Sequence, residues 1–506
     1  YMFASVVVEN PADLPGNSPE PGLTLGEKIS TDNGIVVPTA SDLALRLLRV
    51  FFIATTPSNW QTFSSTSDMT WNPQYPALPF IAYTNDGTRS QVADLNATLH
   101  SYFQEPRTLK KTQNPPTPGV GEVWIDTQFE MTASKSKPGT ATAVDANTWQ
   151  VSKKVALPGQ NMNNPHNMWT DKNQKYIYQT EWFDNKLDIF KRSDGSFVSQ
   201  IKVGESPAHV QTRSDTDDLH VSLNGANGIA EILAGTTTVN RVIPMQNADE
   251  DPTHPHAHWM THDGKKMVTP NAFTADSTVY NFNTDHRDAK VHTGAHPIAT
   301  GMMPDDSKYY VANFLDSTLS MINTATGTKM SDINLLTGYV PTGGLTGLIP
   351  GGDPLPGLFA ANPDGIPAVI GALPIQTPVS PDGKAMVTAN TLTGTIVITN
   401  STNDTAFKTL ACDAGCHGVN FGAKQGGGYY AYVSSKFSNR MIVVDIDPNN
   451  DGKVGDAKVV GSVILAASPS IRDDTVTGNA GMGGQGVLAI PNIYNGWVQK
   501  IPDSTR

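Results

Sequence analysis

Twelve histidines are spread through this 506-residue chain, and their spacing is the feature best suited to chemistry. Several lie about 40 residues apart, and three alternate in the segment HPHAH at 254–258. Neutral imidazoles suit copper, zinc or nickel and bind calcium or magnesium poorly. If these side chains meet in the fold, they predict a transition-metal site. The candidate ligands are His166, His209, His254, His256, His258, His296 and His417.

Acidic residues directly precede the HPHAH segment. A metal-bound histidine usually donates its second ring N–H to a carboxylate, a backbone carbonyl or water. Asp249, Glu250 and Asp251 are therefore candidates to orient the metal ligands. The alternative is a solvated acidic loop.

The chain has two cysteines, Cys412 and Cys416, and His417 follows them in the segment CDAGCH. Three interpretations are open. The cysteines can form a disulfide in an oxidising compartment, or provide thiolates to a metal site together with His417. The segment also resembles a c-type haem attachment motif, which implies thioether bonds and His417 as axial ligand. It departs from that motif because three residues, not two, separate the cysteines.

A second metal signal lies at 445–456, DIDPNNDGKVGD. Alternating acidic and amide side chains followed by a glycine are typical of the start of a calcium loop. No flanking helices are expected, and Lys458 stands near the point where an EF-hand has its bidentate Glu. The sequence therefore predicts a calcium loop between strands, with a plain turn as the alternative. Its candidate ligands are Asp445, Asp447, Asn449, Asp451, Lys453 and Asp456.

These residues must be positioned by a repeated unit of about 40 residues. Copies include HPIATGMMPDDSKYYVANFLDSTLSMI at 296–322 and LPIQTPVSPDGKAMVTANTLTGTIVIT at 373–399. Short strands separated by polar turns, without a helical period, predict an all-β propeller built of four-stranded blades. Equivalent positions on successive innermost strands converge on the axis of a propeller. The histidines at the start of these strands are therefore expected to form a ring.

The segments PVSPDGKAMVTAN and MMPDDSKYYVANF resemble the YVTN or YncE type of seven-bladed propeller repeat, and the resemblance covers roughly residues 120–506. It implies the fold and not the function, because surface, binding and enzymatic proteins share this repeat. Residues 122–155 and 484–501 either complete one blade, which gives the favoured count of seven, or form two blades, which gives eight. The histidine placement is similar to that of the nitrous oxide reductase propeller, which implies copper at the axis. No cysteine-rich copper loop supports the same reaction.

Outside the repeat, residues 1–117 are expected to form an extension with helices near 43–50 and 89–103 and a linker at 111–121. The propeller is expected over 118–506, with a Gly- and Pro-rich insertion at 338–372. Residues 464–486 are expected to form a loop, and GMGGQG at 481–486 a loose turn rather than a dinucleotide site.

The formal charge of −12, without any basic run, excludes a nucleic-acid partner. No apolar run reaches the roughly 18 residues of a membrane helix. The scarcity of Lys and Arg, together with a calcium loop, favours a periplasmic, extracellular or cell-surface location.

The favoured hypothesis is an exported propeller that binds copper, or zinc, through its histidines and acts in redox chemistry as a copper-dependent oxidoreductase. The alternatives are a non-enzymatic surface or secreted binding propeller, and a haem c electron carrier that uses Cys412, Cys416 and His417. A redox or surface protein is the partner that these hypotheses expect.

Overall fold

The computed structural model describes residues 112–129, 139–157, 160, 162, 165–182, 184–314, 316–335, 372–391, 394–412, 415–435, 440–465 and 482–492. The helices expected near 43–50 and 89–103, and nearly all of the insertion at 338–372, lie outside these ranges. The described residues contain strands and no α-helix, so none of them forms a helix that could cross a membrane.

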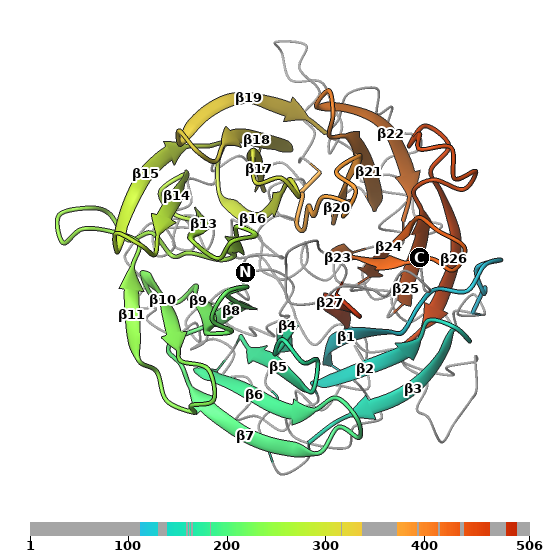
Figure 1. Ribbon diagram of the computed structural model, residues 1–506, viewed down its shortest axis with the longest axis horizontal. Helices are drawn as coiled ribbons and strands as arrows, with labels where there is room; N and C mark the ends of the chain where they lie inside the picture. The colour runs from blue at the N-terminus through green and yellow to red at the C-terminus, as the bar shows by residue number, and fades with distance from the viewer. Residues whose placement is uncertain are drawn as a thin grey trace, which may run out of the picture. The chain divides into compact units, whose positions relative to one another are not determined.

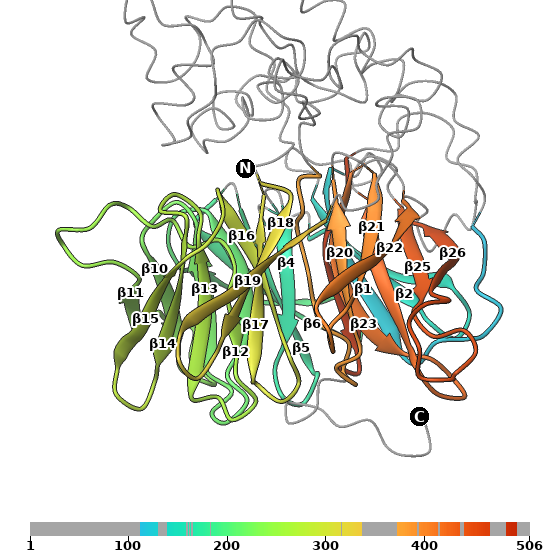
Figure 2. The same ribbon diagram turned by 90° about the horizontal axis from the view of Figure 1, so that it is seen from above.

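Seven sheets stand side by side around one axis, as Figure 1 shows face-on and Figure 2 from the side. The described strands begin with three from one blade, β1 (Glu122–Phe129), β2 (Thr140–Asp145) and β3 (Gln150–Val155). Three complete blades follow in chain order. They are β4 (Pro165–Thr170), β5 (Tyr176–Glu181), β6 (Lys186–Lys191) and β7 (Phe197–Lys202); β8 (Pro207–Thr212), β9 (Leu219–Leu223), β10 (Gly228–Ile232) and β11 (Arg241–Pro244); and β12 (Trp259–Met260), β13 (Lys266–Asn271), β14 (Asp276–Asn281) and β15 (His286–His292).

The later blades comprise β16 (Pro297–Met302), β17 (Lys308–Asn313), β18 (Thr318–Asn323) and β19 (Thr328–Asn334); β20 (Ala385–Asn390), β21 (Thr395–Asn400) and β22 (Thr405–Ala411); and β23 (Cys416–Ala423), β24 (Tyr429–Ser435), β25 (Arg440–Asp445) and β26 (Lys458–Ile464). In the β20 blade, residues 374–379 take the innermost position through bridges from Pro374 to Asn390 and from Val379 to Met386. The predicted all-β propeller of seven four-stranded blades is confirmed.

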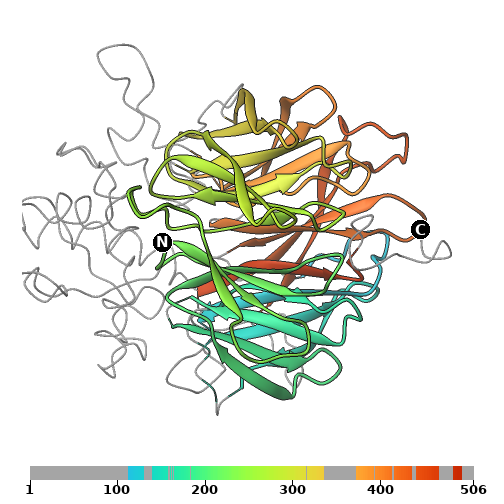
Figure 3. The same cartoon turned by 60° about the vertical axis from the view of Figure 1, so that its left-hand side comes forward.

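The ring closes by joining the two ends of the propeller. β27 (Met482–Ile490) pairs antiparallel with β1, from Glu122 opposite Ile490 to Phe129 opposite Met482, and becomes the innermost strand of the β1–β3 blade. In Figure 3 this late strand lies beside the earliest strands. Closure of this kind leaves fewer free sheet edges. The two terminal fragments thus form one blade. The prediction of a loop over 464–486 was wrong for residues 482–486, which belong to β27.

Burial differs between the inner and outer strands of a blade. Both faces of an inner strand pack against neighbouring blades, so β16 and β23 are buried at every residue. The outermost strands β15 and β19 expose most of their residues to solvent. The inner strands therefore lose the alternation of apolar and polar residues that marks a half-exposed strand.

The innermost strands begin with a repeated backbone turn. Ser206, His254, His296 and Leu373 each precede a proline, and each has a φ between 46° and 53°. The carbonyl of each accepts the N–H of the residue just after the next strand, at 3.0 to 3.2 Å. A residue in this left-handed conformation is directed differently from the strand residues that follow. This turn decides which histidines reach the axis.

Candidate metal centre

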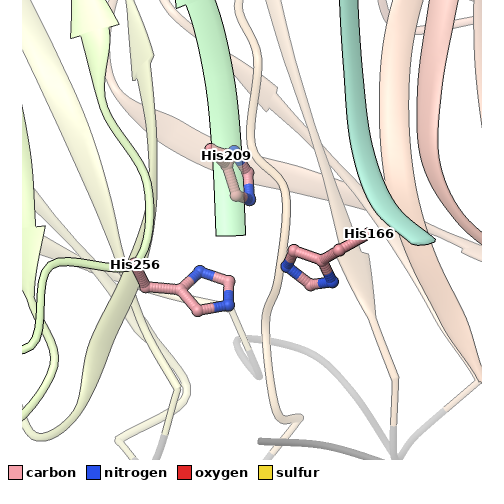
Figure 4. Close-up of side chains that lie close together, drawn as sticks. All are labelled: His166, His209 and His256. Carbon is pink, nitrogen blue, oxygen red and sulfur yellow. The ribbon is translucent and has the colours of Figure 1, made fainter. Parts of the chain in front are cut away.

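Three histidines from three blades meet at the propeller axis. His166 lies on β4, His209 on β8, and His256 in the segment before β12. One ring nitrogen from each lies within 4.8 Å of those from the other two. Figure 4 shows the three rings turned toward a common space. An ion at about 2.0–2.1 Å from each nitrogen requires the nitrogens to lie closer than about 4.2 Å.

Hydrogen bonds orient two of these rings. His166 Nδ1 lies 2.7 Å from Gln485 Oε1, and His256 Nδ1 lies 2.8 Å from the backbone oxygen of Ile298. Both partners are acceptors, so each Nδ1 carries the proton and each Nε2 keeps a lone pair. Within the described residues, the Nε2 atoms of His166 and His256 are buried without a hydrogen-bond partner. Such an atom is costly in a protein unless something binds it.

The site also keeps its histidines neutral. Burial lowers the pKa of His166 and His256 well below the ordinary value, and the neighbouring imidazoles lower it further. Burial lowers the pKa of His209 to about 3. Protonated imidazoles cannot bind a metal, and these three rings are unprotonated at neutral pH.

Two further side chains border the three histidines. The ring centroid of His417, on β23, lies 5.8 Å from that of His166. The Trp182 ring lies 4.5 Å from His166 and 5.8 Å from His256. His166, His256 and His417 each stand one residue after the start of an inner strand or its equivalent, so they occupy matching levels of three blades. His417 thus borders the axial group, although its nitrogens are not among those that lie within 4.8 Å of one another.

The remaining predicted ligands lie elsewhere. His254 donates from Nδ1 to the backbone oxygen of Asn224 at 2.7 Å, and its ring lies 4.1 Å from Phe273. The ring of His296 lies 6.0 Å from Phe273 and 5.9 Å from Phe314. Both histidines occupy the left-handed position one residue before the proline. The structure therefore does not bring these two into the axial group.

His258 lines a cavity of about 40 Å³ in the channel, and His209 lines the same cavity. His258 is nearly completely buried, and burial lowers its pKa well below the ordinary value. It lies two residues beyond His256 in the segment before β12. His258 is therefore a residue of the channel wall, adjacent to the three axial histidines.

The acidic residues at 249–251 do not orient the axial histidines. Glu250 accepts from Arg287 Nη1 at 3.0 Å and from Asn247, and Asp249 and Asp251 are exposed. The orienting groups are Gln485 and the carbonyl of Ile298 instead, both from inner strands adjacent in space. Of the two alternatives for this segment, Asp249 and Asp251 follow the solvated loop, because proximity in sequence does not give proximity at the axis.

Gln485 and Trp182 were missed by the sequence analysis. Gln485 belongs to GMGGQG, which was interpreted as a loose turn, whereas residues 482–490 form β27. The apolar run GVLAI after the glycines was the available signal for a strand. Trp182 directly follows β5, a position that carries no chemical pattern of its own.

Cys412 and Cys416 are joined in a disulfide, with Cα atoms 6.4 Å apart. Cys416 is the first residue of β23, and His417 is the second. Of the three interpretations of CDAGCH, the structure contains the disulfide. Its effect is to restrain the backbone directly before His417.

Part of the predicted calcium loop is assembled. Carboxylate oxygens of Asp447, Asp451 and Asp456 lie within 4.8 Å of one another. Both oxygens of Asp456 are buried, without a hydrogen-bond partner among the described residues. Asp445 instead accepts from Lys424 Nζ at 3.0 Å through each oxygen. Asn449 is exposed, and the backbone N–H of Lys453 donates to Asp451.

No protein-family model matches this chain, and no curated protein matches its sequence. Solved structures match the fold. A protein from Lactobacillus plantarum is 13% identical with a TM-score of 0.51, and the match covers 72% of this chain and 98% of that one. Hydrazine synthase from Kuenenia stuttgartiensis is 16% identical with a TM-score of 0.48, covering 67% and 98%. At 13% identity, the similarity to the Lactobacillus plantarum protein supports the fold alone. The finer resemblances to the YVTN repeat and to nitrous oxide reductase stay predictions.

Proposed function

We propose that this propeller is a metalloprotein that binds copper, or zinc, at its axis through His166, His209 and His256. The observation that supports the proposal is the convergence of three neutral imidazoles from three blades, two of which have buried and unpartnered Nε2 atoms. Imidazole nitrogens favour copper and zinc over magnesium and calcium, and copper binds such sites most strongly among the divalent ions. His417 is the candidate for a fourth ligand.

The proposal includes a redox role and a location outside the cytoplasm. Three protein ligands leave a coordination position for a small molecule, as in catalytic metal sites. The Cys412–Cys416 disulfide supports an oxidising compartment, because such bonds persist there. Fractionation of the native cells tests the location. Ascorbate should abolish the Cu(II) resonance, and air should restore it as oxygen reoxidises the ion.

The metal is tested by elemental analysis of protein purified without chelator, followed by loading with Cu(II) or Zn(II). We expect about one bound ion per chain, and nitrogen hyperfine structure in the Cu(II) resonance. His166→Asn should lose the ion, whereas His286→Asn, at an exposed histidine of β15, should retain it. Full metal content in the His166→Asn protein would contradict the proposal and favour a binding propeller without a metal.

Trp182 offers an independent reporter, because its ring lies 4.5 Å from that of His166. Paramagnetic Cu(II) quenches a tryptophan at such a distance, while Zn(II) does not. Copper should therefore remove part of the emission of the native protein. In the Trp182→Phe variant, copper should bind equally and quench less.

A calcium site is a second candidate, and the observation that favours it is the unpartnered buried carboxylate of Asp456. A bound cation would balance this group beside Asp447 and Asp451. Calcium at millimolar concentration should raise the melting temperature, and Asp456→Asn should abolish that rise. An equal rise in the variant would refute a calcium site at this loop.

A further inference from the structure

The channel beside the axial histidines contains a cavity walled by side-chain amides. It has a volume of about 40 Å³, and its lining includes Asn167, Gln211, Gln376 and Asn420. About 10–15 Å³ of such volume holds one water molecule, so the space accepts a ligand of about three heavy atoms. The described lining residues include no Asp, Glu, Lys or Arg.

Three of these amides are oriented by the same kind of contact. Asn167 Oδ1 accepts from the backbone N–H of Val210 at 3.2 Å. Gln211 Oε1 accepts from that of Met260 at 3.0 Å, and Gln376 Oε1 from that of Val419 at 2.8 Å. In each case the oxygen is bonded to the innermost strand of the next blade. The oxygens are thus used to connect blades and are not available to a ligand.

The amide nitrogens are left as donors. Within the described residues, no hydrogen bond is made by the side-chain nitrogens of Asn167, Gln211 or Gln376, and these atoms are not sealed away from the cavity. The hydroxyl of Thr300, on the same wall, is buried without a partner in the described chain. The cavity therefore presents several donors and no carboxylate.

His209 connects this cavity to the axial group. Its ring lies 5.5 Å from that of His166 and 5.2 Å from that of His256, and it also lines the cavity. A molecule in the cavity would therefore lie next to an ion held by the three histidines. A divalent ion there would add positive potential to the neutral amide donors.

We propose that this cavity binds a small monovalent inorganic anion of about three atoms, held by the amide N–H groups of Asn167, Gln211 and Gln376 and directed at the metal. The amide donors favour an anion over a cation, and the volume of about 40 Å³ fits a ligand of a few atoms. The anion site rests on the proposed function for its contact with the metal, but its donors belong to the protein alone.

The test is a titration of Cu(II)-loaded protein with azide, followed by its charge-transfer band, with metal content measured on the same samples. Gln211→Glu keeps an oxygen for the N–H of Met260 and replaces the donating NH2 with a second oxygen. Its azide dissociation constant should rise at least about 10-fold, because a hydrogen bond to an anion is replaced by repulsion. Gln425→Glu, at an exposed turn, makes the same charge change and should leave azide binding unaltered.

A second measurement separates this inference from the metal proposal. Line broadening of bromide NMR, with metal-free protein, should detect the anion site, and Gln376→Glu and Gln211→Glu should both reduce it. Broadening lost in these variants upholds the anion site even if no metal binds. Equal azide and bromide binding in native and variant proteins overturns it, even where copper is bound in full.

Discussion

The axial histidines, His166, His209 and His256, contrast with the flanking histidines, His254 and His296. Both groups are buried or half-buried, and both lie at the start of innermost strands. The axial rings face one another, whereas the flanking rings pack against Phe273 and Phe314. The axial histidines lie two or three residues beyond the position that the flanking histidines occupy. Position relative to the left-handed turn therefore matters more than residue type.

The segment HPHAH shows this within five residues. His254 adopts the left-handed turn and stacks on Phe273, His256 joins the axial group, and His258 lines the cavity farther along the channel. Three histidines with one alternating pattern thus have three environments. A local cluster in sequence is not a local cluster in space when each residue of a strand adds about 3.3 Å of rise.

The largest effect should come from making the same His→Asn substitution once in the axial group and once in the flanking group. His256→Asn should weaken copper binding about 100-fold or more, because loss of a ligand exceeds the 10–100-fold cost of losing a group that only orients one. His254→Asn should leave it unchanged, since Asn tolerates the left-handed conformation. Competition with a chelator measures both. Equal losses in the two variants would remove the distinction between the groups.

A smaller effect is expected from the residue that orients His166. Gln485→Leu removes the acceptor 2.7 Å from Nδ1 and should weaken metal binding about 10–100-fold. Gln200→Leu, on the outer strand β7, makes the same chemical change away from the axis and is the control. Unchanged affinity in the Gln485 variant would show that the fold alone orients the imidazole.

Two glycines, Gly418 and Gly301, lie where the inner strands of neighbouring blades approach each other closely. A Cβ atom on Gly418 would lie 1.9 Å from the backbone oxygen of Gln485, and one on Gly301 would lie 2.0 Å from that of Thr377. Alanine at either site should destabilise the protein by about 1–3 kcal/mol. Thermal unfolding measures this loss. Both variants should also weaken metal binding, because Gly418→Ala displaces the strand that carries Gln485 and Gly301→Ala disturbs β16, whose Ile298 carbonyl orients His256.

The smallest effect concerns pH and the flanking pair. Burial lowers the pKa of His296 to about 3. As the pH falls below about 6.5, this histidine is therefore protonated in the unfolded chain before it is protonated in the folded chain. Its contribution to stability is thus complete above pH 6.5 and declines as the pH falls toward 3. In metal-free protein, His296→Asn should reduce the loss of stability between pH 7 and pH 5 by about 2 kcal/mol. Urea unfolding at both values measures this, and an unchanged loss would contradict the burial argument.

Much of the architecture followed from local pattern. Repeated strands with polar turns predicted the blades, and Asp-Gly turns such as 263–264 and 382–383 supply the left-handed glycines that the hairpins need. The fragments at each end predicted closure of the ring. The role of β27 in holding His166 did not follow, because its glycine-rich start lacks the usual composition of a strand.

By itself, the sequence determined the all-β propeller repeat and the set of histidines from which a site could be drawn, because these depend on composition and on periods within about 40 residues. It favoured seven blades over eight, and the pairing of β27 with β1 decided the count. Only the tertiary structure decided which histidines meet, which amides face the channel and that Gln485 orients His166. These contacts join residues as far apart as 166 and 485. Their geometry depends on the angle between blades and on where each histidine lies relative to the start of its inner strand. A short sequence pattern does not specify either of these.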